Sequence, residues 1–166
     1  MKAAQESKRS AYLLVLYSYF TDGAVVLTVN AVLKSILAEY QWTDGQGGLL
    51  IACMSAGLLV SSLIGNSVME RLGRSRTMTM LGLFICVSLG LFSLSPWPAT
   101  FYPLVFVAGL AWGGINSLAN TIVNELYDGS ASRLNIMHAC FACSAVLFPL
   151  LVGFITMQGG SWRIVP

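Results

Sequence analysis

Polar side chains with chemical potential lie inside the long apolar runs of this sequence. The clearest case is Asp22 in "YFTDGAVVLTVN", because an ionisable group in such a run is costly and is a functional candidate by default. Its carboxyl group could take up and release a proton. The alternative is a structural acid bonded to a neighbouring helix end or to a tyrosine hydroxyl, with Tyr17 and Tyr19 close in sequence. Asn30, farther along the same run, is a candidate ligand-binding residue.

A second set of candidates is the amide series Asn116, Asn120 and Asn124, spaced four residues apart. Four residues turn an α-helix by about 400°, so the three amides form one polar stripe with a slow drift. Their paired donors and acceptors suit a hydroxylated ligand such as a sugar. Hydrogen bonding between helices is the alternative for Asn116 and Asn120. Asn124 is expected near the membrane–water interface.

Asn135 and His138 follow in the next apolar run, three residues apart. His138 could bond a ligand or close an inner gate, although a lone histidine is more often structural. Trp112, beside the amide stripe, could stack on a sugar ring or serve only in packing.

Other chemistry is not indicated by the sequence. Cys140 and Cys143 form a CxxC, but on a helix they give only two ligands on one face, and no second pair follows. We therefore predict no metal and no cofactor. The sequence contains no Ser-His-Asp set, no phosphate-binding glycine loop and no paired acids within the apolar runs, so an enzyme is not expected.

The composition of the chain indicates the elements that must position these groups. Of its 166 residues, 56% are hydrophobic and only 10% are charged. A soluble domain carries about 25% charged residues, so the sequence predicts an integral membrane protein surrounded by lipid. Nucleic acid is excluded as a partner because no basic tract with interleaved aromatic residues occurs.

Five segments are long and apolar enough to cross a membrane, which takes roughly 20 residues as a helix. We predict an all-α membrane protein with helices at about 11–37, 47–69, 78–94, 101–123 and 134–157. In the links, "TDGQ" is typical of a helix start with Thr43 or Asp44 as N-cap, and the prolines of "SPWP" prevent a helix from continuing. The first segment is too long for a cleavable signal peptide.

Small residues are frequent in two of these segments. They include Gly109, Gly113 and Gly114 in the fourth segment, and Gly57 and Ser61 in the second. Small side chains let membrane helices approach closely, so these positions predict tight packing.

The basic residues predict the orientation of the chain. With the N-terminus in the cytoplasm, seven of the nine Lys and Arg residues are cytoplasmic, and only Lys34 and Arg163 lie outside. The seven are Lys2, Lys8, Arg9, Arg71, Arg74, Arg76 and Arg133.

The cytoplasmic link between the second and third segments contains "ERLGR", an acid, a base, a variable residue, a glycine and a base. This pattern resembles the loop between helices 2 and 3 of the major facilitator superfamily. "YFTDGAVVLTVNAVL" and "GLAWGGINSLANTIVNEL" resemble its helices 1 and 4. "SRLNIMHACFACSAVLFPLL" resembles helix 5 of the sugar-permease branch that includes fucose permease. The resemblance covers about residues 12–157.

The resemblance implies a cytoplasmic gate. Glu70 is then the acid, Arg71 and Arg74 are its basic partners, Gly73 is the turn, and Glu125 is a further partner for Arg74. The family has Asp at the position of Glu70. It also has a glycine four residues before this acid, where this sequence has Asn66, and Gly65 is one position away. The alternative is that the arginines serve only as topology signals. On the gating hypothesis, Glu70→Ala impairs transport but not membrane insertion.

The resemblance also implies a function and a missing part. Family members have twelve helices in two similar halves, and here a sixth helix would only begin at 162–166. We expect an incomplete N-terminal half that needs a C-terminal half or a second subunit. Its expected function is proton-coupled transport of a small polar solute, such as a sugar, by alternating access in a bacterial inner membrane. The alternative is a transport-incompetent half that acts as a membrane scaffold or assembly subunit.

Overall fold

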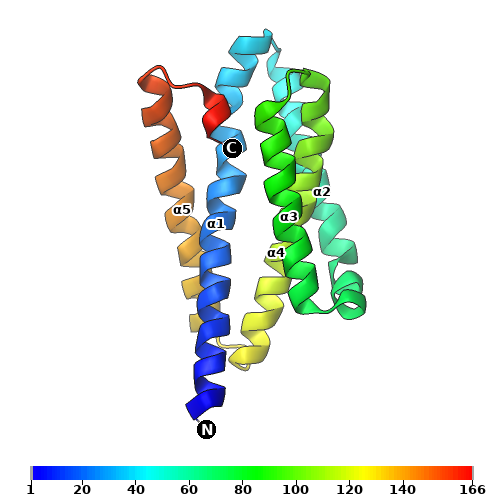
Figure 1. Cartoon of the computed structure of the whole chain (residues 1–166), viewed down its shortest axis with the longest axis vertical. Helices are drawn as coiled ribbons and strands as arrows, with labels where there is room; N and C mark the ends of the chain where they lie inside the picture. Colours follow the sequence, from blue (N-terminus) through cyan, green and yellow to red (C-terminus); the bar gives the residue numbers. More distant parts are fainter. Residues whose placement is uncertain (1, 166) are drawn as a thin grey trace.

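The computed structural model describes the backbone of residues 2–165, and the side chains of residues 5–65 and 67–165. Five long helices run side by side, and the chain reverses direction between each and the next (Figure 1). All five are long and apolar enough to cross a membrane, so the prediction of an all-α membrane fold is confirmed. The helices are α1 Lys2–Tyr40, α2 Asp44–Leu72, α3 Arg74–Leu94, α4 Phe101–Leu126 and α5 Ala131–Met157.

Two short 3-10 helices complete the described part of the chain. Pro98–Thr100 (η1) leads into α4, after the prolines of "SPWP" have ended α3. Trp162–Ile164 (η2) lies where a sixth helix was expected to begin, and Pro166 lies outside the described residues.

Several helices extend beyond the predicted bounds at the end of the bundle that holds the N-terminus. The segment that precedes residue 11 is helical from Lys2, and the predicted link 70–77 is helical except at Gly73. These extensions are rich in Gln, Glu, Lys and Arg, which are polar but form helices readily. An apolar window therefore finds the membrane-spanning part of such a helix and not its ends.

The start of α2 is fixed by its cap. Thr43 Oγ1 accepts a hydrogen bond from the Gln46 backbone N–H at 3.4 Å, and Gln46 Oε1 accepts one from the Thr43 N–H at 2.9 Å. This reciprocal pair satisfies two donors that the first turn leaves free. Thr43 is the N-cap of the two candidates that the sequence offered.

The bundle is organised by close pairs of helices. The most extensive packing is between α2 and α4, followed by α1 with α5 and α3 with α4. A Cβ at Gly57 would collide with the Phe106 carbonyl oxygen, and one at Gly109 with the Met54 carbonyl oxygen. The predicted small-residue packing of α2 on α4 is therefore present. Gly23 has the same role between α1 and α5, because a Cβ there would collide with Ser144.

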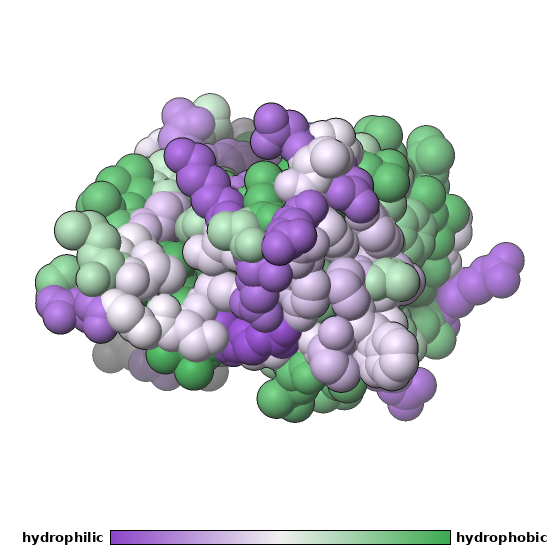
Figure 2. All heavy atoms as spheres, turned by 90° about the horizontal axis from the view of Figure 1, so that it is seen from above, coloured by the Kyte–Doolittle hydropathy of each residue, from purple (hydrophilic) through white to green (hydrophobic). Residues whose placement is uncertain are grey.

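The surface agrees with a bundle embedded in lipid. Seen from the end that holds the α1–α2 and α3–α4 connections, hydrophilic residues gather over the middle and hydrophobic residues lie along the flanks (Figure 2). Large apolar side chains such as Leu63, Leu150 and Phe154 are more than half exposed on the sides of the bundle. A protein surrounded by water rarely exposes so much apolar surface.

Candidate functional site

A polar cluster forms where α1, α4 and α5 meet inside the apolar bundle. At its centre, the Asn120 side-chain amide Nδ2 lies 2.9 Å from the Tyr19 hydroxyl oxygen. The same nitrogen lies 2.8 Å from the Asn116 backbone carbonyl and 2.9 Å from the Asn116 Oδ1. The predicted stripe on α4 is thus a connected pair of amides that reaches across to α1.

The imidazole of His138 adds a third helix to this cluster. Its ring lies edge-on to the Tyr19 ring, with 5.5 Å between the centroids. Tyr19 is fully buried, Asn116 and Asn120 are half-buried, and His138 is exposed. The cluster therefore has a buried base and an open edge that a solute can reach.

The chemistry of this cluster is that of hydrogen bonding. Amide, phenol and imidazole groups supply both donors and acceptors, which suits hydroxyl and carbonyl groups of a polar ligand. Among the described residues, no group of three or more His, Cys, Asp or Glu side chains could hold a metal ion. The four cysteines are free thiols, and Cys86 and Cys143 are exposed.

Asp22 lies one helical turn beyond Tyr19 but in a separate groove between α1, α3 and α4. The groove has a volume of about 280 Å³, and its walls include Ser18, Ile85 and Ile115. Asp22 is 2% exposed, and neither carboxylate oxygen has a hydrogen-bond partner among the described residues. The tyrosine bond that the sequence offered as an alternative is therefore not formed. An ionised carboxylate at such a place needs donors or a counter-charge.

The remaining predicted ligand-binding residues do not join the cluster. Asn30, Asn124 and Asn135 are exposed, and within the described side chains no hydrogen bond connects them to Tyr19 or Asn120. Trp112 is half-buried and packs against the main core, and its indole N–H is buried without a partner in the described residues.

Tyr19 is the member of the cluster that sequence reasoning considered only as a partner for Asp22. Its hydroxyl is the group that connects α1 to the α4 amides. The signal in the sequence was a hydroxyl inside an apolar run, three residues before an acid. It could not be assigned to Asn120 without knowing which helices pack together.

One ion pair stands at the end of the bundle that holds the N-terminus. Arg74 contacts Glu125 through its two terminal guanidinium nitrogens, at 2.5 Å and 2.6 Å, and joins the start of α3 to the end of α4. The two side chains are 51% and 48% exposed. Glu70 and Arg71 are also exposed, and the predicted pairing of Glu70 with Arg71 or Arg74 is not among the ion pairs of the described residues.

The two predicted glycines of this loop differ in their surroundings. Gly73 is the one residue between α2 and α3, and its φ of +80° favours glycine because a Cβ would be strained there. Gly65 is helical and lines a groove of about 220 Å³ between α2, α3 and α4. Apart from its chain neighbours and its own helix backbone, no described residue has an atom within 4 Å of the place where its Cβ would be, so close packing does not require glycine there.

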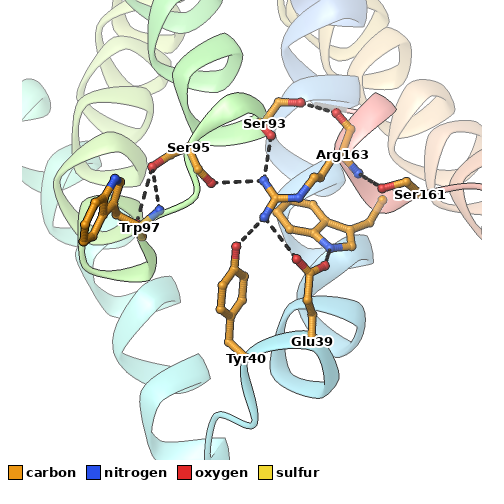
Figure 3. A network of polar contacts seen from close by, with 8 residues as sticks. Glu39, Tyr40, Ser93, Ser95, Trp97, Ser161 and Arg163 are labelled. Atoms are coloured by element: carbon orange, nitrogen blue, oxygen red, sulfur yellow. Dashed lines mark hydrogen bonds and ion pairs between the residues drawn. The ribbon is translucent and has the colours of Figure 1, made fainter.

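The opposite end of the bundle carries a larger network around Arg163, shown in Figure 3. Its guanidinium donates to the Ser93 and Ser95 backbone carbonyls at 2.9 Å and 3.0 Å, to Glu39 at 3.0 Å and to the Tyr40 hydroxyl. The Trp162 indole N–H donates to the second oxygen of Glu39. Sequence reasoning used Arg163 only as a charge on the outer side.

Spanning helices packed around a buried polar cluster define a multi-pass membrane protein. The sequence profile of the Major Facilitator Superfamily matches residues 12–165, and the chain belongs to this superfamily. The resemblance found from the loop and helix motifs is confirmed.

Two curated relatives are bacterial transporters. The glucose/mannose transporter GlcP of Bacillus subtilis is 22% identical over 144 residues, which are 87% of this chain and 36% of that protein. The cis,cis-muconate transport protein of Acinetobacter baylyi is 26% identical over 158 residues, 93% of this chain and 38% of that protein. This chain thus spans about a third of the length of these relatives. No solved structure matches the chain significantly.

Proposed function

We propose that this chain forms the N-terminal part of a transporter that moves a small polar solute, such as a sugar, across the membrane with protons. The observation that carries this proposal is the cluster of Tyr19, Asn116, Asn120 and His138, which offers hydrogen-bonding groups inside an apolar bundle. Two relatives named as transporters, one of them for glucose and mannose, support the same class of activity.

In the proposed mechanism, the solute binds between this chain and a second set of helices that completes the carrier. Parallel half-repeats of this kind place the binding site at their interface. The Asn120 amide and the His138 imidazole bond the solute from one wall, and the carrier opens alternately to either side. In this proposal the N-terminus lies on the cytoplasmic side of the membrane, because most basic residues are at that end. The two bacterial relatives support a bacterial inner membrane as the location.

Solute uptake by the complete protein in proteoliposomes tests this role. Asn120→Ala removes the amide that joins Tyr19 to Asn116, and loss of one such part-buried bond, about 1–3 kcal/mol, should lower uptake by about fivefold to a hundredfold. Asn124→Ala is the matched control, because this exposed amide lies one turn farther on the same helix. Equal uptake by the two variants would contradict the assigned site. Absence of uptake by the unmodified complete protein, with glucose and with a dicarboxylate, would favour the scaffold alternative.

Asp22 is the proposed proton-coupling group. This role is supported by a buried carboxyl with no hydrogen-bond partner among the described side chains, one turn from the cluster. Asn is nearly isosteric and cannot titrate, so Asp22→Asn should abolish solute-driven proton uptake while the variant still exchanges solute. A pH indicator inside the vesicles measures the proton flux. Unchanged proton movement per solute in the variant would exclude this role.

A further inference from the structure

A large groove lies at the N-terminal end of the bundle, on the same three helices as the polar cluster. It runs between the start of α1, the end of α4 and the start of α5, and its volume is about 780 Å³. Three cations line it, namely Lys8, Arg9 and Arg133. None of the described residues that line it is acidic, so its charge is unbalanced.

Arg133 is held in this groove by aromatic rings. Its guanidinium carbon lies 5.3 Å from the centroid of the Tyr12 ring and 4.8 Å from that of Tyr127. The Tyr12 hydroxyl donates a hydrogen bond to the Arg133 backbone carbonyl at 2.9 Å, which fixes the start of α5 against α1. Contacts with ring faces position a guanidinium without supplying a counter-charge that matches its five N–H donors.

The acids nearest in sequence do not neutralise these cations. Glu6 and Asp128 are both exposed, and in the described part of the chain neither forms an ion pair. Arg74, another arginine at this end, is already paired with Glu125. The groove therefore presents a preformed site for an anion, with Arg133 as its fixed member.

The floor of the groove is apolar. Leu13 and Ile136 line it and are 54% and 43% exposed, and Leu16 continues the same face of α1. From Lys8 to Leu16 the helix rises by about 12 Å, and over this distance the lining of the groove changes from basic to apolar. This depth matches a lipid headgroup followed by the first part of an acyl chain. A soluble anion could use only the rim.

We propose that this groove binds an anionic phospholipid, with its headgroup phosphate at Arg133 and an acyl chain along Leu13 and Leu16. Basic pockets between membrane helices on the cytoplasmic side suit such headgroups, and guanidinium pairs well with phosphate. The groove lies at the end of the bundle that is rich in basic residues. The inference does not depend on the solute, because neither Asn120 nor His138 lines the groove.

Native mass spectrometry of the complete protein in mild detergent tests this proposal, with phosphatidylglycerol and phosphatidylcholine titrated in parallel. We expect phosphatidylglycerol to bind at least about tenfold more tightly, since each Lys or Arg near the headgroup contributes about fivefold. Arg133→Gln should lower the affinity for phosphatidylglycerol about fivefold. Changing Lys8, Arg9 and Arg133 together to Gln should lower it about a hundredfold. Arg133→Lys keeps the charge and should retain the preference.

Arg76→Gln is the matched control, because Arg76 is exposed at the same end, is unpaired among the described residues and does not line the groove. Its affinity for phosphatidylglycerol should stay within about twofold of the unmodified protein. Equal binding of the two lipids, or equal losses in Arg76→Gln and Arg133→Gln, would overturn the proposal. Displacement of the lipid by an equal concentration of inorganic phosphate or glycerophosphoglycerol would assign the groove to a soluble anion instead.

Discussion

The two ends of the bundle are held in different ways. At the N-terminal end, one exposed ion pair between Arg74 and Glu125 connects α3 to α4, next to a one-residue turn. At the opposite end, Arg163 bonds to α1 and to the end of α3 at once, and its side chain is only 27% exposed. Phe92, Phe101 and Trp162 pack together beside it.

The two contacts differ in the free energy needed to break them, which is small for the Arg74–Glu125 pair and larger for the Arg163 network. An exposed ion pair contributes about 0–1 kcal/mol, so a modest change of surroundings can break it. A partly buried arginine that donates to several backbone and side-chain groups takes all of these hydrogen bonds away at once when it is removed. We therefore expect the Arg163 network to serve folding, and the Arg74–Glu125 pair to serve the transport cycle.

The largest expected effect is on the Arg163 network. Arg163→Ala removes the donors to Ser93, Ser95 and Glu39, and should lower the free energy of unfolding by about 2–3 kcal/mol. Denaturation of the complete protein in mixed micelles, followed by the fluorescence of tryptophan, measures this loss.

Two further variants make this measurement specific. Glu39→Gln keeps an acceptor for the Trp162 indole N–H but loses the charge, so about 1 kcal/mol should be lost. Arg76→Ala removes an exposed arginine that is unpaired among the described residues, and should change the unfolding free energy by less than about 0.5 kcal/mol. If Arg163→Ala is as stable as Arg76→Ala, the network does not anchor this end.

Much of the fold could be predicted from the sequence because lipid imposes simple rules. The length of each apolar run identified the five helices, the cap at Thr43 and the prolines after Ser95 marked helix limits, and glycine at 57 and 109 marked the tightest pair. The helical start of α1 before residue 11, and the helical conformation of most of the link at 70–77, were not predicted. Polar helix formers continue a helix beyond the membrane without any apolar signal.

The candidate site was predicted less completely. The α4 stripe and His138 were found from their types and spacing, but Tyr19 and the Arg163 network depend on contacts between residues 68 to 124 positions apart. Asp22 was found from its charge, and its placement in a groove apart from Asn120 could not be read from spacing along one helix. Local periodicity gives the face of a helix but not the neighbour that the face meets.

The most direct test of the central claim is to measure Glu125→Gln for both stability and solute uptake in the complete protein. We predict a loss of unfolding free energy below about 1 kcal/mol, together with an uptake rate that is lower by about fivefold, because loss of the pair shifts the balance between carrier states. Glu6→Gln, which removes an exposed acid at the same end that is unpaired in the described residues, is the control and should leave both quantities unchanged. Normal uptake by Glu125→Gln, or a loss of stability as large as that of Arg163→Ala, would contradict the account.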